Sequence, residues 1–568
     1  MLLGYAITIS VIFSFLALII SIILYKKKLL EILKRQITFK TTLLLFAILA
    51  FFLFFLLLFV HPVEQLYFDE NIYQGIALNI VHSGNSLWCQ FGTGHLTHCY
   101  NNQLYHDPVG LELFLGIALV LFGSNPGTAY AFELFLGVLS IIGVFLLSSL
   151  LTERKMLAPI SAAVFALIPE VIIWSRTQAA PDILFMMLTI YAFFFFVVFT
   201  KKENRLTGIM FLSSLSLVFY SRIEALVLLP IFFILYFIFG QFGVKHTIKT
   251  RLKTIKKILD DWKALSILFI FVIIFIPQIL YIYTENTSPQ YGQSSGQKII
   301  SISNFLQNKS PNINFFLGTT SNYPSISSIN LLILSILGII FIISFKKIRN
   351  KVGLLFMLLI TALAFFVFYT SFYAGSVNYG VDVRFMLEIM PFLAILSGFG
   401  ILGLSDILSK IFRKITKSKK DISSIFISLI VIFSIILPFY FLIPFLTLPV
   451  SQMPQEYFNS QATSFIYNNY QKVPTSCLVF SFTPDIWYEL NRSAAQVSYF
   501  TQSNNETINT IFKNYSCFVF DYGYWCTISS YKNSTCGANL YSYNLSVIAT
   551  NRTTEGSNFT LYRINNFT

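Results

Sequence analysis

The sequence predicts an α-helical polytopic membrane protein with a small α/β domain at its C-terminal end. Of 568 residues, 55% are hydrophobic and only 11% are charged, a composition that water-soluble proteins of this length do not have. Apolar runs long enough to span a bilayer recur up to residue 446. The hydropathy then falls, and the roughly 120 residues from 447 to 568 are enough for one small domain.

Twelve apolar segments predict membrane-spanning helices within residues 1–446. They are residues 2–25, 41–60, 128–151, 156–174, 182–200, 205–220, 223–242, 264–284, 328–345, 351–373, 386–404 and 422–446. A shorter run at about 108–122 predicts a helix in the membrane interface. In segment 2–25 the basic cluster follows the apolar run, which indicates a retained span and not a signal peptide.

The positions of Lys and Arg predict the orientation. With residues at their margins, six loops on one side hold 28 of the 39 basic residues: 26–40, 152–155, 201–204, 241–263, 346–350 and 405–421. The positive-inside rule makes that side cytoplasmic. Both termini, the long loop 61–127 and the C-terminal domain are then outside, and we expect a plasma-membrane location. The net charge of +14 thus reflects topology and attraction to membrane lipids, with no nucleic-acid partner.

Sequons and cysteines agree with this orientation, because all lie on the predicted outer side. The N-x-[ST] pattern predicts glycans at Asn286, Asn308, Asn491, Asn505, Asn514, Asn533, Asn544, Asn551, Asn558 and Asn566. Six cysteines on an oxidising face predict disulfides. Fifteen pairings are possible, and we prefer Cys89–Cys99, Cys477–Cys517 and Cys526–Cys536. A zinc site is disfavoured because no Cys-x-x-Cys or clustered His accompanies them.

The C-terminal region alternates strand-like and helix-like runs, which predicts a small α/β sheet. The strand-like runs are 477–482, 495–500 and 517–520, and the helix-like runs lie near 456–470, 484–490 and 505–514. We expect short, glycosylated strands in the last forty residues. The external loop 285–327 is rich in Ser, Asn, Gln and Gly, so we expect it to be mobile and without a motif.

The candidate site begins with the pair Asp69 and Glu70, just after a span that ends at His61-Pro62. Apolar residues at helical spacing follow and predict an amphipathic helix in the interface plane. Tyr73 falls on the same helix face as the pair. A carboxylate there can act as general base toward a hydroxyl; alternatively, the pair only caps a surface helix.

Further ionisable residues sit at the outer ends of spans. Any one of them could be a snorkelling end charge, but together they place acids and fixed cations on one leaflet, where such groups usually face a cavity. They are Glu170, Arg176, Asp182, Arg222, Glu224, Asp382, Arg384 and Glu388, with Tyr379 nearby.

Several motifs carry a family resemblance. D-E-x-x-Y gives Asp69, Glu70 and Tyr73, and His106-Asp107-Pro108 opens the second interfacial helix. Pro181-Asp182 ends a short loop, and D-x-R-F contains Asp382 and Arg384. In this order, and followed by an outer α/β domain, they resemble the GT-C superfamily of polyprenyl-phosphate-dependent glycosyltransferases, in the branch of protein mannosyltransferases and the aminoarabinose transferase.

The resemblance implies a GT-C fold and the inverting transfer of one sugar, a mannose-type hexose, from a polyprenyl- or dolichyl-phosphate donor. The acceptor would be a hydroxyl on a protein or a lipid-linked glycan. Asp69 would be the general base and Glu70 its neighbour that orients or tunes it. Arg384, with Arg222 or Arg176, would hold the donor phosphate. The remaining substrate-binding positions would be Tyr73, His106, Asp182, Glu224 and Asp382, with no metal and no other cofactor.

Two alternatives stay open. Asp521-Tyr-Gly-Tyr-Trp525 resembles the W-W-D-Y-G motif of oligosaccharyltransferases, which need a divalent cation and transfer a whole glycan, although a strand end and turn is the favoured interpretation. The other alternative is a transporter. Transporters carry charge near the bilayer midplane, so one outer site containing Asp69, Asp182 and Arg384 would favour the transferase.

Overall fold

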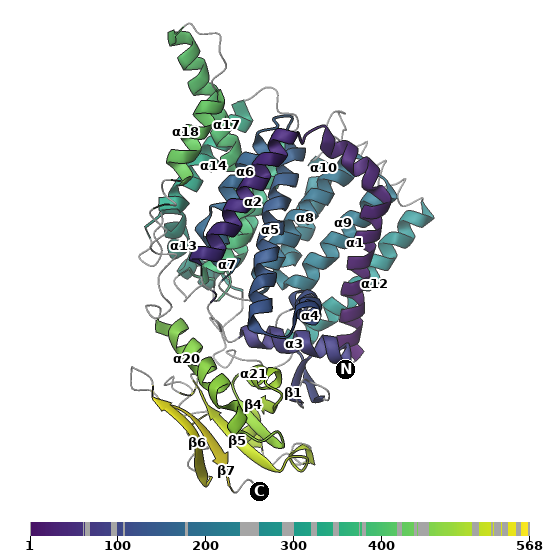
Figure 1. Cartoon of the computed structure of the whole chain (residues 1–568). Helices are drawn as coiled ribbons and strands as arrows, with labels where there is room; N and C mark the ends of the chain where they lie inside the picture. Colours follow the sequence, from purple (N-terminus) through teal and green to yellow (C-terminus); the bar gives the residue numbers. More distant parts are fainter. Residues whose placement is uncertain are drawn as a thin grey trace.

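A computed structural model shows a helical bundle with an α/β domain against one of its ends (Figure 1). Both chain termini lie at that end. The structure describes residues 2–60, 62, 69–92, 99–105, 108–176, 180–238, 261–286, 300–319, 326–344, 351–373, 375–377, 382–416, 423–436, 440, 454–502, 510–523, 526, 536, 543–552 and 558–565.

Each of the twelve predicted segments contains helix, which confirms the polytopic helical fold. The long bundle helices are α1 (Leu2–Lys34), α2 (Phe39–Phe59), α5 (Pro126–Leu151), α8 (Pro181–Lys201), α9 (Arg205–Ser221), α12 (Trp262–Asn286), α14 (Ile326–Ser344) and α17 (Met390–Thr416). Shorter pieces complete the bundle: α6 (Leu157–Ala166), α7 (Pro169–Trp174), η2 (Ile223–Val227), α10 (Leu228–Ile238), α15 (Lys351–Leu355), η4 (Phe356–Ile360), α16 (Thr361–Thr370), η5 (Asp382–Ile389), α18 (Ser423–Val431) and η6 (Ile432–Ile436).

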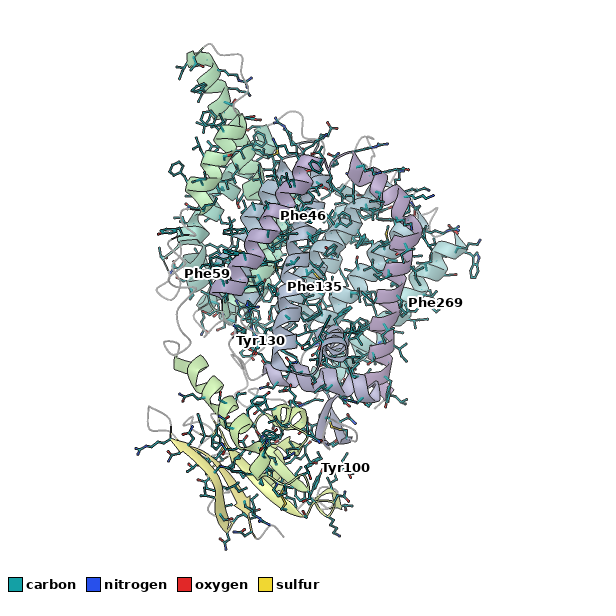
Figure 2. All side chains as sticks on the ribbon, viewed as in Figure 1. Phe46, Phe59, Tyr100, Tyr130, Phe135 and Phe269 are labelled. Carbon is teal, nitrogen blue, oxygen red and sulfur yellow. A yellow bond between two sulfur atoms is a disulfide. The ribbon has the colours of Figure 1, made fainter. Side chains whose placement is uncertain are left out.

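Length and composition allow seven helices in the described part to cross a membrane. The outside of the bundle is apolar: Phe46, Phe135 and Phe269, labelled in Figure 2, are 64%, 55% and 64% exposed. A surface of this kind, extending over many turns, suits contact with lipid chains.

The helix that carries the Asp-Glu pair is α3 (Asp69–Ser83), which lies across the end of the bundle (Figure 1). It is not the half-exposed interfacial helix that the sequence predicts, because Glu70 to Ile80 are all buried. Helix α4 (Gly110–Phe122) packs on one side of α3, and the C-terminal domain covers another. Helix α4 agrees better with the prediction of a helix in the membrane interface, because its apolar residues Val120, Leu121 and Phe122 are 62%, 68% and 75% exposed.

The C-terminal domain is the predicted α/β sheet. Its strands are β3 (Cys477–Ser481), β4 (Ser493–Gln496), β5 (Cys517–Tyr522), β6 (Leu545–Arg552) and β7 (Asn558–Ile564), with helices α20 (Pro454–Asn469) and α21 (Pro484–Glu489). Strand β3 runs parallel to β4 and β5 at the centre, while β7 adds antiparallel to β5.

Two strands of this sheet come from the first external loop, which the sequence did not predict. Strands β1 (Trp88–Gly92) and β2 (Cys99–Gln103) form a hairpin, and β1 pairs antiparallel with β4 at Gly92 and Ala494. The strand order is β2-β1-β4-β3-β5-β7-β6. The sheet of the C-terminal domain, called the outer domain below after its predicted location, is therefore built from both the 61–127 loop and the chain after residue 447.

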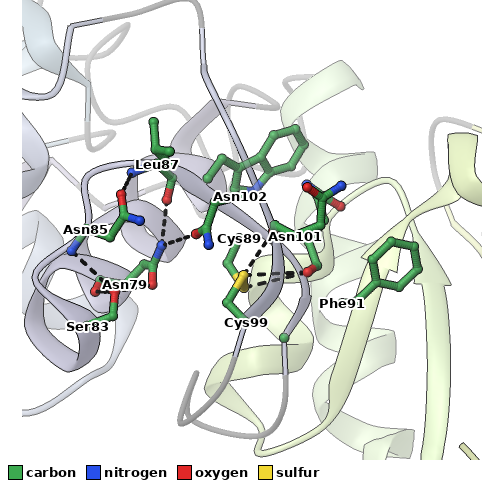
Figure 3. The surroundings of a disulfide bond; sticks show 12 residues. Asn79, Ser83, Asn85, Leu87, Cys89, Phe91, Cys99, Asn101 and Asn102 are labelled. Carbon is green, nitrogen blue, oxygen red and sulfur yellow. Dashed lines mark hydrogen bonds between the residues drawn. A yellow bond between two sulfur atoms is a disulfide. The ribbon is translucent and has the colours of Figure 1, made fainter. Parts of the chain in front are cut away.

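All three preferred disulfides are confirmed, each with Cα atoms 4.5–5.8 Å apart. Cys477 and Cys517 are register partners on β3 and β5. Figure 3 shows the surroundings of Cys89–Cys99, where the Asn79 side chain of α3 donates to Leu87 O at 2.7 Å and Asn102 Oδ1 at 3.0 Å. These two hydrogen bonds hold the β1–β2 hairpin against α3.

Part of the 285–327 loop forms a helix that the sequence analysis missed, α13 (Ile302–Leu317), capped by Ser301 and ended by a left-handed Gly318. The Asn308 side chain is buried and donates to Thr370 O and Phe372 O at 3.1 and 2.9 Å. A glycan on Asn308 would break both bonds, so we no longer expect one there. Exposed sequon asparagines are Asn491, Asn514, Asn544, Asn551 and Asn558; the side chains of Asn286, Asn505, Asn533 and Asn566 lie outside the described part.

Candidate active site

Asp69 is the first residue of α3 and is half-buried. Its Oδ1 accepts a hydrogen bond from the hydroxyl of Tyr105. The Tyr105 ring packs edge-on against Tyr73, with centroids 6.0 Å apart, and against Trp88 at 5.7 Å. Asp69 and Tyr73 therefore share one helix face, as predicted. Sequence reasoning missed Tyr105, because nothing in the sequence indicated that the residue before the His-Asp-Pro motif reaches Asp69.

Glu70, the next residue, is only 1% exposed. It lies within electrostatic range of Glu133 on α5, which is also within range of Asp182 at the start of α8. Glu70 on α3, Glu133 on α5 and Asp182 on α8 are thus three carboxylates within electrostatic range of their neighbours. Glu133 was missed in the sequence, although an ionisable residue inside an apolar span is itself a signal of function.

Arg222, at the C-terminal cap of α9, sits between two carboxylates. Its Nη1 is 2.5 Å from Asp182 Oδ1, and its Nη2 is 3.0 Å from Glu224 Oε1. The Arg222 side chain is 7% exposed, and Glu388 lies within electrostatic range of all three groups. Because two acids already engage Arg222, it suits the neutralisation of buried charge better than the binding of a ligand phosphate.

Arg384 and Arg176 lie nearby at the same end of the bundle. Arg384 belongs to η5, which packs against α7, α8 and α16, and its guanidinium carbon is 4.9 Å from the Phe385 ring centroid. Arg176 follows α7, and its Nε donates to Val60 O at 2.8 Å. Partial burial lowers the pKa of Arg176, and no carboxylate pairs with it among the described residues.

Some predicted site residues cannot be placed. His106, Tyr379 and the Asp382 side chain lie outside the described part of the structure. Glu170 is buried in the first turn of α7. Among the placed groups, Asp182, Arg222, Glu224 and Glu388 lie within electrostatic range of one another.

Asp521 of the D-Y-G-Y-W stretch lies within the C-terminal domain at the end of β5. It accepts hydrogen bonds from Ser481 Oγ at 2.7 Å and Trp487 Nε1 at 3.2 Å, and burial raises its pKa to about 6. This supports the strand-end interpretation. The described residues contain no group of three His, Cys, Asp or Glu placed to hold a metal ion.

The comparisons with known proteins agree with this fold. The family model of dolichyl-phosphate-mannose-protein mannosyltransferases matches residues 106–281. The oligosaccharyltransferase of Archaeoglobus fulgidus, in its apo form, superposes with a TM-score of 0.50 at 13% identity over 91% of this chain and 74% of that one. ArnT from Cupriavidus metallidurans, bound to undecaprenyl phosphate, gives a TM-score of 0.49 at 11% identity, over 93% and 98%. No curated protein sequence matches significantly.

The helical bundle with an α/β domain at one end is thus the fold that this oligosaccharyltransferase also has. Over residues 106–281 the sequence is similar to the family of dolichyl-phosphate-mannose-protein mannosyltransferases.

Proposed function

We propose that this enzyme transfers one mannose-type hexose, with inversion, from a polyprenyl- or dolichyl-phosphate donor to an acceptor hydroxyl on the outer face of the plasma membrane. The observation that carries the proposal is the half-buried Asp69 carboxylate, held through one oxygen by Tyr105 at the same end of the bundle as Arg176 and Arg384. The matched family model, which names a dolichyl-phosphate-mannose donor and a protein acceptor, supports this choice of sugar and lipid.

In the proposed reaction, Asp69 takes the proton of the acceptor hydroxyl as its oxygen attacks the anomeric carbon. The bond between that carbon and the phosphate oxygen breaks on the opposite side, which inverts the configuration and releases the lipid phosphate. Arg384 and Arg176 hold the phosphate, since a guanidinium fork matches its oxygens and stabilises the charge of the leaving group. No nucleotide is needed, because the lipid phosphate already activates the sugar.

The buried groups behind Asp69 have a supporting role in this proposal. Arg222 compensates Asp182 and Glu224, which holds η2 against α8. Glu70 faces Glu133 and influences Asp69 through the local field. The acceptor is a Ser or Thr hydroxyl of a protein, with a lipid-linked glycan as the other acceptor class to test.

The test measures sugar transfer by the purified protein from labelled polyprenyl-phospho-mannose to a Ser/Thr peptide and to a lipid-linked glycan. Asp69→Asn should lower turnover by about 100- to 10,000-fold, the usual worth of general-base assistance, while donor binding stays near normal. Asp261→Asn is the matched control, because Asp261 also sits at the start of a helix (α12) but pairs with Arg205.

Arg384→Ala and Arg176→Ala should weaken donor binding as well as turnover. Near-normal turnover of Asp69→Asn would refute the assignment of the base and direct attention to Asp182. Chelation should have no effect on any variant. Loss of transfer on chelation would instead favour the oligosaccharyltransferase alternative.

A further inference from the structure

The C-terminal domain reaches the carboxylate of Asp69 through an unbroken series of buried contacts. The series begins at Asp485 in α21, whose two carboxylate oxygens each accept from Trp88 Nε1 at 3.2 Å. The Trp88 ring packs edge-on against Tyr105 at 5.7 Å. The Tyr105 hydroxyl then donates to Asp69 Oδ1.

Every member of the series before Asp69 is closely enclosed. Asp485, Trp88 and Tyr105 are 1%, 4% and 6% exposed. Protein interiors pack as densely as organic crystals, so a displacement of one of these side chains cannot be absorbed by empty space. When one of these side chains moves, the neighbouring ring must therefore move as well.

Asp485 also fixes how the domain sits on α3. A Cβ added at Gly75 of α3 would lie 1.7 Å from Asp485 Oδ1, so the carboxyl group lies directly against the helix backbone. Only glycine permits this approach. The same carboxyl group therefore contacts both the helix that begins with Asp69 and the tryptophan that supports Tyr105.

We infer that Asp485 and Trp88 are positioning residues of the outer domain, which set the orientation of the Asp69 carboxylate through Tyr105. This inference rests on the proposed role of Asp69 as general base. Trp88 supports the ring of Tyr105, and Tyr105 occupies one oxygen of Asp69, which directs the other toward the acceptor. A base must meet its proton within hydrogen-bond reach, and displacement by about 1 Å can cost 100-fold in rate.

The test compares variants that remove one polar group and keep an aromatic ring, which is smaller in the tryptophan variant. Tyr105→Phe removes only the hydroxyl on Asp69, and Trp88→Phe removes the N–H on Asp485. We expect kcat to fall on the order of 10- to 100-fold for Tyr105→Phe, the worth of a hydrogen bond to a charged group, and about 10-fold for Trp88→Phe, while KM for donor and acceptor stays within about twofold.

The domain supplies a matched control for each variant. Trp487→Phe also removes an indole N–H that donates to a buried aspartate at 3.2 Å, but that aspartate is Asp521, away from the series. Tyr499→Phe removes a hydroxyl that joins the hairpin to the domain through Asn101 and Gln103, again away from Asp69. Both controls should lose comparable thermal stability and keep kcat.

Conservative replacement gives a further readout. Asp485→Ala should lower kcat because Trp88 loses its acceptor. Asp485→Asn should restore most of it, since burial raises the pKa of Asp485 and a neutral amide still accepts from the indole. A general loss of domain stability would not be rescued in this way.

The decisive measurement is a double-mutant cycle. If the series acts through Asp69, then Trp88→Phe and Tyr105→Phe should add less than about twofold to the defect of Asp69→Asn. Multiplicative losses, or control variants that lose kcat equally, would overturn the inference. The inference fails alone if Asp69→Asn abolishes transfer and both phenylalanine variants keep full kcat. If Asp69→Asn is active, the proposed base itself is wrong.

Discussion

Removal of the Arg222 guanidinium should destabilise the bundle strongly. The Arg222 side chain is 7% exposed and lies 2.5 Å from Asp182, which is fully buried, and 3.0 Å from Glu224, which is 13% exposed. In Arg222→Met both carboxylates lose their counter-charge while still close to Glu388. Breaking a buried pair in this way costs about 3–5 kcal/mol, which is a large part of the 5–15 kcal/mol typical of a folded protein.

A second substitution tests whether the loss of stability is due to uncompensated charge. Adding Asp182→Asn to Arg222→Met should recover part of the loss, because it removes one of the two carboxylates that have lost their counter-charge, while Glu224 remains. Arg222→Lys should lie between the two, since one ammonium group cannot reproduce the two-sided fork contact. The measurement is the unfolding free energy from denaturant titration in mixed micelles.

An exposed ion pair serves as the control. Arg205 and Asp261 also lie 2.8 Å apart, but their side chains are 50% and 35% exposed. Arg205→Met should therefore cost less than about 1 kcal/mol. The reasoning is refuted if Arg222→Met costs no more than this control, or if Asp182→Asn makes the double variant worse.

Three further predictions address the outer domain and the orientation. In the folded protein the pKa of Asp521 is raised from 3.8 to about 6, so the folded state binds this proton more tightly than the unfolded state. The free energy of unfolding of the parent should therefore fall by on the order of 3 kcal/mol as the pH rises from 4 to 6. Asp521→Asn should lack this fall, as measured by thermal unfolding across that pH range. Replacing both Cys477 and Cys517 by Ala should cost roughly 4 kcal/mol by loop-closure entropy, measured by denaturant unfolding, and a loss below 1 kcal/mol would contradict it. In intact cells, an impermeant thiol reagent should label Thr319→Cys but not Lys263→Cys; the reverse pattern would invert the orientation.

The elements that the sequence predicted well are those determined by local composition. The twelve apolar segments all contain helix because a bilayer-length run must satisfy its own backbone hydrogen bonds. The central strands around Cys477 and Cys517 were recognisable because buried parallel strands are continuously apolar. The three disulfide pairs were a preference among fifteen possible pairings, and the folded sheet supports that preference by placing Cys477 and Cys517 opposite each other on neighbouring strands.

The elements that the sequence did not predict depend on contacts distant in the chain. Strands β1 and β2 have only five residues each, and β1 pairs with an edge of β4 that comes about 400 residues later in the chain. Helix α13 is held by Asn308 and Asn312, whose partners lie near residues 370–377. Glu133, Tyr105 and Trp88 join the site for the same reason, since only tertiary packing brings Tyr105 to Asp69, Trp88 to Tyr105 and Glu133 near Glu70.

The structure also places the two neighbouring carboxylates of the Asp-Glu pair in different surroundings. Asp69 and Glu70 are neighbours, but a helix turns its successive side chains by about 100°. Helix α3 begins at Asp69, and the next eleven residues, Glu70 to Ile80, are all buried, so that of the two carboxylates only Asp69 keeps part of its surface open. Glu70 is buried within electrostatic range of Glu133. The proposed division between base and supporting acid therefore rests on where the helix begins.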